Sequence, residues 1–243
     1  MLRDAIRRTR VYQPLHFVFH LLFDPRFRRD QWFRLRQPQR LYQVSSVTFE
    51  DRYPLEFRFV RDWLGDSSER SLLSFGCSTG EEVFSLRRYF PSAAIKGIDI
   101  NPDNIAICKR RLSGMGAPAL AAKTGFAAAS GTDVEPAGHY DAIFCMAVLR
   151  HGALTKESVQ RCDPVLRFAD FEVAVNDFAR CLKPGGLLVI QHSNFRFGDT
   201  DTATGFEPVL RLGDAVVPGT PIFDRNNGRV PDTGYGDVVF RKR

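Results

Sequence analysis

Short apolar runs alternate with amphipathic stretches from about residue 71 to the end of the chain. The apolar runs have the length of strands and lie at residues 71–75, 94–99, 119–122, 140–146, 187–191 and 235–241. Between them, residues 82–90 and 168–182 place apolar side chains three or four positions apart, which predicts helices. Strands that alternate with helices are typical of a parallel sheet covered on both faces. The pattern therefore predicts a doubly wound α/β fold.

Local signals set the ends of several elements. Asn101-Pro102 predicts a helix start, because an Asn side chain caps free N–H groups and Pro fits the first helical position. That helix is expected to run to about residue 112. The Asn227-Gly228 pair predicts a tight hairpin turn. We expect no clear helix between residues 193 and 233.

The chain divides by charge into a basic arm and a nearly neutral body. Residues 1–40 hold ten Arg and three Asp with no Lys or Glu, a net charge of +7, so the remainder of this +6 chain sums to −1. We predict an aromatic-rich helical cap over residues 1–60 and a catalytic domain over residues 61–243. The basic arm suits an anionic acceptor, a membrane surface or nucleic acid, and the alternative is a solvated helical face.

The sequence predicts neither a membrane span nor a metal centre. The longest apolar run, residues 15–23, is far shorter than the ~18–20 residues that cross a bilayer, and no signal-peptide cleavage site follows it. We therefore expect a cytoplasmic protein. The five cysteines include no C-x-x-C pair, which argues against structural zinc and a disulfide framework. His16 and His20 lie four apart, and we expect packing or acceptor lining there.

A small-residue turn is the central chemical signal. Residues 75–82, Phe-Gly-Cys-Ser-Thr-Gly-Glu-Glu, lie directly between a predicted strand and a predicted helix. Small residues let the backbone approach a ligand, and the helix start offers unpaired N–H donors. Asp99 ends the next strand, 19 residues after Gly80, where a carboxylate can accept hydrogen bonds from both ribose hydroxyls of a nucleoside.

The spacing and charge of this turn disfavour a dinucleotide. Ser78 stands where the fingerprint G-x-G-x-x-G needs its second glycine, and no P-loop sequence is present, so a nicotinamide-dependent enzyme is the weaker alternative. Glu81 and Glu82 would repel a pyrophosphate but suit a ligand with an ammonium group. S-adenosyl-L-methionine (SAM) carries a ribose and a methionine amino group, so the residues favour SAM. The alternative is that both acids only stabilise the first helical turn.

These residues resemble a known family. Residues 72–82 resemble the SAM-binding motif of class I methyltransferases, and the Cys-Ser-Thr-Gly-Glu-Glu form is similar to the CheR-type chemotaxis-receptor methyltransferases. Residues 140–149 and 182–188 look like later strand motifs of the same superfamily. The resemblance covers roughly residues 70–195 and implies a Rossmann-like fold with a seven-stranded, mostly parallel sheet. Past the first motif the CheR likeness ends, because Met146-Ala147 replaces Arg-Asn.

The resemblance also implies roles for individual residues. The turn residues that would wrap the methionine part are Gly76, Cys77, Ser78, Thr79 and Gly80. It implies that Glu81 or Glu82 lies near the amino group and that Asp99 holds the ribose. Ile100 would pack on the adenine, and Met146 would lie beneath the cofactor. Many relatives have an acid where this chain has Ser74, and a loop glutamate is expected to replace it here.

Two histidines are the candidates for a general base. Open α/β sheets bind ligands at the carboxyl ends of their strands. His151 follows the fourth predicted strand and His192 ends the fifth, and an ordinary imidazole titrates near pH ~6.5. We expect one of them to take the acceptor's proton, and the alternative is that each ring only makes a structural hydrogen bond.

The acceptor is expected to be a small-molecule or glycan hydroxyl or carboxyl. Residues 145–148, Cys-Met-Ala-Val, differ from the Asn/Asp-Pro-Pro-aromatic motif that usually accompanies methylation of a base amine, so nucleic acid is not favoured. RNA engaged by the basic arm, a protein carboxyl, or SAM binding without turnover are the alternatives. An acceptor held by the basic arm would lose affinity steeply as ionic strength rises.

Overall fold

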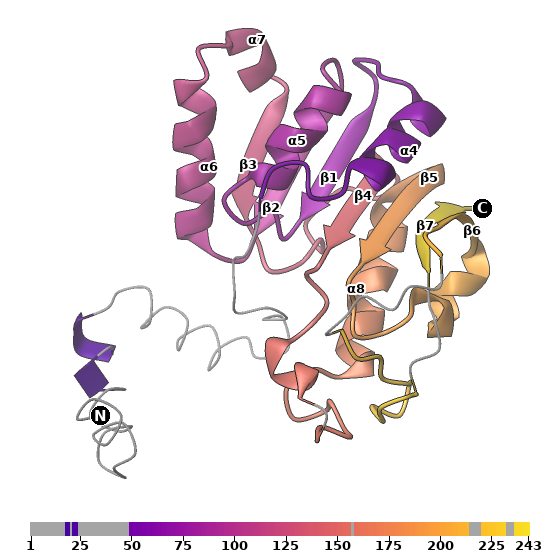
Figure 1. Ribbon diagram of the computed structural model, residues 1–243. Coiled ribbons are helices and arrows are strands. Elements are labelled where there is room, and N and C mark those ends of the chain that lie inside the picture. Colours follow the sequence, from indigo (N-terminus) through magenta and orange to yellow (C-terminus); the bar gives the residue numbers. More distant parts are fainter. Residues whose placement is uncertain (1–17, 20, 24–48, 157, 214–219, 232–235) are drawn as a thin grey trace. The chain divides into compact units, whose positions relative to one another are not determined.

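The computed structural model describes residues 18–19, 21–23, 49–156, 158–213, 220–231 and 236–243. The chain divides into two compact units, Met1–Leu41 and Tyr42–Arg243. The second unit holds a seven-stranded sheet in the order β3-β2-β1-β4-β5-β7-β6 (Figure 1). Strands β1 to β5 pair in parallel, whereas β7 is antiparallel to both β5 and β6. The predicted doubly wound, mostly parallel sheet is confirmed.

The strands are β1 (Ser71–Phe75), β2 (Ala94–Asp99), β3 (Thr124–Ala128), β4 (Tyr140–Met146), β5 (Leu182–Gln191), β6 (Phe206–Arg211) and β7 (Asp237–Lys242). The helices of this unit are α4 (Pro54–Leu64), α5 (Glu81–Tyr89), α6 (Pro102–Gly114), α7 (Pro118–Ala121) and α8 (Phe168–Cys181). The predicted ranges for β1, β2 and β4 agree with the structure to the residue, and those for α5 and α8 agree to within one.

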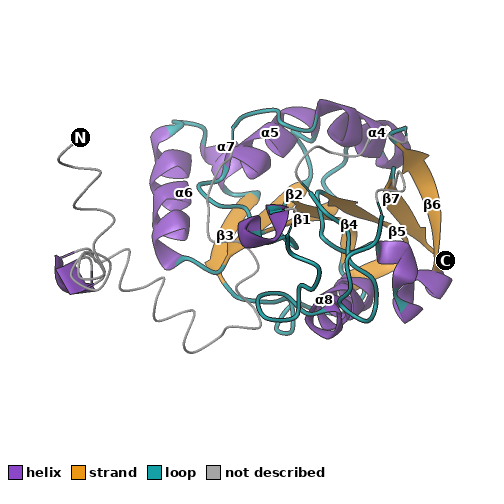
Figure 2. Ribbon diagram, turned by 60° about the horizontal axis from the view of Figure 1, so that its bottom comes forward, coloured by secondary structure: helices purple, strands orange, loops and turns teal. Residues whose placement is uncertain are grey.

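Alternate residues of the central strands point into two separate cores. Leu72 and Phe144 pack with residues of α4, α5 and α6 on one face of the sheet. Leu73 and Ile143 pack with residues of α8 on the other face. Figure 2 shows α5 and α8 on opposite sides of the sheet. Because successive side chains alternate across a strand, a sheet covered on both faces needs continuous apolar strands, which is the pattern that the sequence carries.

Two local signals act as predicted. The Asn101 side chain accepts a hydrogen bond from the backbone N–H of Asp103 at 3.0 Å, so it caps α6, and Pro102 occupies the first turn. Asn227 has a φ of +63°, and its turn closes with a hydrogen bond from the Asp224 N–H to the Gly228 carbonyl at 2.8 Å. Phe223 and Arg229 form an antiparallel bridge across this turn.

The predicted third strand at residues 119–122 is wrong. Pro118–Ala121 form the short helix α7, and the strand begins at Thr124, which pairs with Ile95 of β2. Pro118 supplies the fixed φ that a first helical turn favours, and the alanines that follow are strong helix formers. Apolar composition alone does not separate such a turn from a strand.

The segment after β5 contains elements that the pattern did not predict. Two 3-10 turns, Phe197–Asp199 and Asp201–Gly205, lead into the edge strand β6. No α-helix lies between residues 193 and 233 in the part of this range that the structure describes. Pro208 lies within β6, where an edge position tolerates the loss of an N–H donor.

Most of the predictions for residues 1–60 fall outside the described residues. These include His16, His20 and the arginines of the basic arm. Helix α4 belongs to the second unit, where Phe57 contacts Phe144 of β4 with ring centroids 5.7 Å apart. Among the helices that the structure describes, none is long and apolar enough to span a bilayer.

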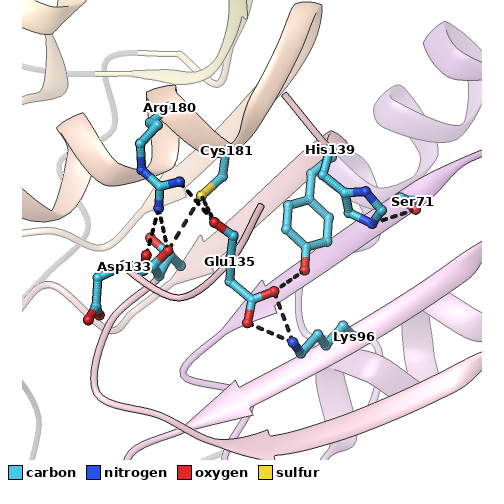
Figure 3. Close-up of polar contacts among 9 residues, drawn as sticks. Ser71, Lys96, Asp133, Glu135, His139, Arg180 and Cys181 are labelled. Atoms are coloured by element: carbon cyan, nitrogen blue, oxygen red, sulfur yellow. Dashed lines mark hydrogen bonds and ion pairs between the residues drawn. The ribbon is translucent and has the colours of Figure 1, made fainter. Parts of the chain in front are cut away.

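A polar network ties the β3–β4 loop to the sheet (Figure 3). Lys96 Nζ donates to both carboxylate oxygens of Glu135, at 2.6 and 2.9 Å, and the Tyr140 hydroxyl donates to Oε2 at 2.5 Å. The Arg180 guanidinium donates to the carbonyls of Thr132 and Glu135, at 2.6 and 2.8 Å. Burial alone would raise the pKa of Glu135, but the hydrogen bonds from Lys96 and Tyr140 lower it below its usual range. The network is structural, because the charges of Lys96 and Glu135 are paired with each other and the Arg180 donors are bound to backbone carbonyls.

We expect Glu135→Gln to lower the free energy of unfolding by about 1–2 kcal/mol at pH 7, since Lys96 is partly exposed and water screens the pair. The lowered pKa means that this stabilisation is present above pH ~4.3 and is lost as the pH falls further. Urea unfolding at pH 7 and pH 3 measures both effects. Glu69→Gln, at an exposed position, is the control. Equal stability of Glu135→Gln and wild type at pH 7 would contradict this account of the network.

Candidate functional site

The turn between β1 and α5 is held against the end of β2. The backbone N–H groups of Gly76 and Cys77 both donate to the Ile98 carbonyl, at 2.8 and 2.9 Å. Gly76 has a φ of +74°, and a Cβ there would lie 2.5 Å from Cγ2 of Val148, in the loop after β4. Gly80 has a φ of +97° and immediately precedes α5. The turn therefore requires glycine at both ends.

Asp99 is fixed at the carboxyl end of β2. Its Oδ2 accepts a hydrogen bond from the Ser78 N–H at 2.8 Å. Its Oδ1 accepts from the Asn101 N–H at 2.8 Å and from the Asn104 side chain at 3.1 Å. Burial raises the pKa of Asp99, whereas these donors favour the ionised form. An ionised carboxylate has about four acceptor positions, so it retains capacity for a ligand hydroxyl.

The turn presents one buried hydroxyl without a partner. Ser78 has a φ of +50°, and its Oγ is buried with no hydrogen-bond partner among the described residues. Buried hydroxyl groups are normally hydrogen-bonded, so this atom suits contact with a polar ligand. The Cys77 side chain instead packs in the core beside Val83, so Cys77 can offer a ligand only its backbone. The Thr79 hydroxyl donates to Glu81 at 2.7 Å.

The two glutamates of the turn have different surroundings. Glu81 pairs with Arg111 at 2.6 Å. Glu82 accepts a hydrogen bond from the Ser74 hydroxyl of β1 at 2.7 Å, so its carboxylate lies beside Ser74, as expected for the loop glutamate. Burial raises the pKa of Glu82 to about 7, although the hydrogen bond from Ser74 and the charge of Arg52 each lower it. Glu82 is thus the acid that remains for a cationic ligand group.

The remaining predicted cofactor contacts lie at the same carboxyl edge of the sheet. Ile100 is half-buried and directly follows Asp99 at the end of β2. Met146 ends β4 and is buried, and the next residue, Ala147, has a φ of +58° and donates its N–H to the Gln191 carbonyl at 2.8 Å. The edge therefore gathers the carboxylates of Asp99 and Glu82 and the unpartnered hydroxyl of Ser78, three groups that could bind a polar ligand.

His151 caps a short turn. Its backbone N–H donates to the Asn194 side-chain oxygen at 2.7 Å, and its ring Nδ1 accepts a hydrogen bond from the Ala153 N–H at 3.2 Å. A neutral ring that accepts at Nδ1 carries its proton on Nε2. In this arrangement His151 is suited to donate a hydrogen bond and not to take a proton.

His192 lies in an apolar and cationic environment. It directly follows β5 with a φ of +55°, and its Nδ1 is buried without a hydrogen-bond partner among the described residues. The ring lies 5.7 Å from the ring of Tyr53. Burial, followed by the charges of Arg52 and Arg150, lowers the pKa of His192 to about 4. The ring is therefore neutral at physiological pH and is a weaker base than the sequence suggested.

Sequence reasoning missed the group that surrounds His192. Arg52 and Tyr53 precede α4, and Arg150 follows β4, where no motif marks them. Pro54, directly after Tyr53, lies in the first turn of α4, and this is a feature of secondary structure alone. Among the described residues, no three His, Cys, Asp or Glu side chains form a group that could hold a metal ion.

One family model matches the central part of this chain. Residues 73–190 match the family model described as "Methyltransferase domain". A search among curated proteins found no matching sequence.

Similar solved structures include geranyl diphosphate C-methyltransferase from Streptomyces coelicolor A3(2). Its sequence is 18% identical and its TM-score is 0.40. The alignment covers 56% of this chain and 44% of the methyltransferase chain. YcgJ protein from Bacillus subtilis is 16% identical with a TM-score of 0.42, covering 61% and 55%. StiE O-MT is 19% identical with a TM-score of 0.40, covering 55% and 40%. This chain thus spans roughly half of the length of each structure. Residues 73–190, just under half of the chain, thus match the model of a methyltransferase domain, and they lie within a seven-stranded, mostly parallel sheet of the doubly wound α/β type.

Proposed function

We propose that this protein transfers the methyl group of SAM to a hydroxyl or carboxyl oxygen of a small-molecule or glycan acceptor. The observation that carries the proposal is the pair of carboxylates at neighbouring strand ends, Asp99 after β2 and Glu82 beside the end of β1. One ligand that carries both ribose hydroxyls and an ammonium group could engage both carboxylates. A dinucleotide offers no ammonium group for Glu82 and would bring phosphate charge toward it.

Each residue of the turn has a role in this proposal. Gly76 and Gly80 let the backbone of the turn wrap the methionine part, and Ser78 Oγ hydrogen-bonds to the ligand. Glu82 binds the ammonium group, while Glu81 holds Arg111 and supports the turn. The remaining contacts are those of Asp99 with the ribose, Ile100 with the adenine, and Met146 beneath the cofactor.

The cofactor, when bound, supplies a methyl group on a positively charged sulfur, and the protein's task is to orient the nucleophile. A hydroxyl acceptor that took this methyl group would give up its proton, and the neutral ring of His192 would take that proton and pass it to solvent. His192, neutral and with an unpartnered Nδ1, accepts a hydrogen bond from that hydroxyl and so orients its lone pair. His151 donates a hydrogen bond from its Nε2 to the acceptor.

We expect SAM affinity to increase about tenfold for each unit by which the pH rises toward 7, and to level off above pH 7. The reason is that the ionised form of Glu82 binds the ammonium group and the pKa of Glu82 is about 7. Protons are released on binding in this range, so calorimetry in two buffers of different ionisation enthalpy measures them. Glu82→Gln removes the pH dependence and lowers affinity about tenfold at pH 8. Methylthioadenosine, which lacks the amino acid part, is the matched ligand. An equal pH dependence for both ligands would exclude an ammonium contact.

A turnover assay distinguishes the roles of the two histidines. We expect His192→Gln to lower kcat about 10- to 100-fold with little change in SAM affinity, since the hydrogen bond acts on the acceptor. His151→Gln should cost less than about threefold. The assay follows S-adenosylhomocysteine (SAH) released with a panel of hydroxyl and carboxyl acceptors. Full turnover by both variants removes the proposed role, and SAM binding with no turnover on any acceptor favours a binding domain.

A further inference from the structure

Three buried polar atoms without partners lie where β5 ends, on the face of the sheet that α4 covers. Tyr53 is 6% exposed, and its hydroxyl has no hydrogen-bond partner among the described residues. The side-chain oxygen of Gln191 and Nδ1 of His192 are likewise buried and unpartnered there. Buried polar atoms are normally hydrogen-bonded, so three of them at one strand end indicate a place where a polar ligand binds.

The fold brings these three side chains together. Val189 of β5 packs in the same core as Tyr53, so the alternation of side chains along the strand directs Gln191 toward that face. His192 follows with a φ of +55°, and the centroid of its ring lies 5.7 Å from that of the Tyr53 ring. Gln191 is also the register partner of Met146, the residue that the proposed function places beneath the cofactor. The three side chains therefore lie beside the proposed cofactor site.

Each of these atoms has a defined role as a donor or an acceptor. Burial raises the pKa of Tyr53 above its usual range, so its hydroxyl keeps its proton and can donate. Burial also raises the pKa of Glu56, and a hydrogen bond from the Gln191 side chain opposes this rise. Because only the amide N–H groups can donate to a carboxylate, the Gln191 oxygen is the atom left to accept. Nδ1 of the neutral His192 ring is the second acceptor.

We propose that Tyr53 and Gln191 bind a second hydroxyl of the methyl acceptor, next to the hydroxyl that His192 binds. One hydroxyl both donates and accepts, so it can donate to the Gln191 oxygen while it accepts from Tyr53. An anion has no hydrogen to give to the amide oxygen, and an acceptor with a single hydroxyl would leave buried groups unpaired. The acceptor class is thus a neutral compound with hydroxyls on adjacent carbons, such as a sugar or another polyol. This inference rests on the proposed function, because it takes the reacting hydroxyl to lie at His192.

The test titrates the full chain, saturated with SAH, with cis-1,2-cyclohexanediol while NMR follows the histidine rings. Cyclohexanol, which lacks the second hydroxyl, is the matched ligand. The His192 signals are assigned by their loss in His192→Gln. We expect a saturable shift of these signals with the diol and about tenfold weaker binding of cyclohexanol, because cyclohexanol leaves the Tyr53 and Gln191 groups unpaired.

Tyr53→Phe removes the hydroxyl and leaves the ring in place. We expect this variant to bind the diol about tenfold more weakly, with unchanged affinity for cyclohexanol and SAH. Its urea midpoint of unfolding should not fall, since the lost hydroxyl has no partner among the described residues. Gln191→Met removes the acceptor oxygen and should weaken diol binding to a similar degree. Tyr89→Phe, which removes a hydroxyl that donates to Asp51 at 2.9 Å, is the matched control and should keep the preference for the diol.

The possible outcomes are distinct. SAH titration of each sample tests the proposed function, and its failure in wild type would overturn that proposal as well as this one. If SAH binds but the diol gives no saturable change at His192, or binds no better than cyclohexanol, the diol subsite is wrong. Equal diol affinity in wild type and either site variant would also overturn it. A lower urea midpoint of Tyr53→Phe with an unchanged diol preference would show that the hydroxyl binds a structural water molecule instead.

Discussion

Asp99→Ala is expected to weaken SAM and SAH binding by about 10- to 100-fold. The side chain is fixed by the Ser78 N–H, the Asn101 N–H and the Asn104 amide, so it is oriented before any ligand arrives. Three donors already fill most of the carboxylate's acceptor positions, so we expect it to bind one ribose hydroxyl, and such a hydrogen bond to a charged acceptor is worth about 1.5–3 kcal/mol. Calorimetric titration of the folded variant measures the loss directly.

Asp99→Ala also lowers the stability of the fold, so the experiment must distinguish a loss of binding from a loss of folded protein. Removal of the carboxylate leaves three donors without their acceptor, and we expect the free energy of unfolding to fall by about 2 kcal/mol. Titrations are therefore made well below the unfolding midpoint, with circular dichroism as the check on folding. Asp62→Ala, at an exposed position of α4, should leave affinity and stability unchanged. Affinity within threefold of wild type in Asp99→Ala would refute the ribose contact.

Gly76→Ala is expected to lower the free energy of unfolding by about 3 kcal/mol and the cofactor affinity by more than tenfold. A φ of +74° is strained for alanine, and the added Cβ would lie 2.5 Å from Val148 Cγ2. Left-handed backbone costs about 1–2 kcal/mol for a residue with a Cβ, and overpacking costs about 1–3 kcal/mol. Because Gly76 begins the turn, a shift of its backbone would displace every backbone N–H donor that follows it.

Two further variants divide this effect into its parts. Gly138 has a φ of +58° with nothing within 4 Å of an added Cβ, so Gly138→Ala carries the backbone strain alone and should cost about 1 kcal/mol without changing affinity. Val148→Ala, combined with Gly76→Ala, removes the clash and should restore part of the lost stability. Equal losses for Gly76→Ala and Gly138→Ala would show that close approach to Val148 is unimportant.

The sequence predicted those parts of the molecule whose local signal and tertiary role agree. β4 is apolar at nearly every position and buried on both faces, so its pattern is unambiguous. Asn101 caps α6 through a contact two residues away, which needs no distant partner. The turn at residues 76–80 and Asp99 were found because spacing along a strand–turn–helix–strand unit determines where they meet.

The errors and omissions have physical causes. Residues 118–121 are apolar and short, and Pro118 with its alanines favours a helical turn over the strand that we predicted. β6 carries Glu207, Pro208 and Arg211 at a sheet edge, so it lacks the alternation of a half-buried strand. The Arg52–Tyr53–Arg150 group joins segments about 100 residues apart, and no local pattern reports such a meeting. Burial, together with the charges of Arg52 and Arg150, lowers the pKa of His192, so the sequence overestimated its strength as a base.

The central claim is that the carboxyl edge of this sheet binds SAM. Calorimetric titration of the full chain with SAM, SAH and NAD tests it most directly. The account predicts micromolar binding of both sulfur nucleosides and no binding of NAD, because Glu82 opposes a phosphate and attracts an ammonium group. Binding of NAD, or no binding of either sulfur nucleoside, would contradict it.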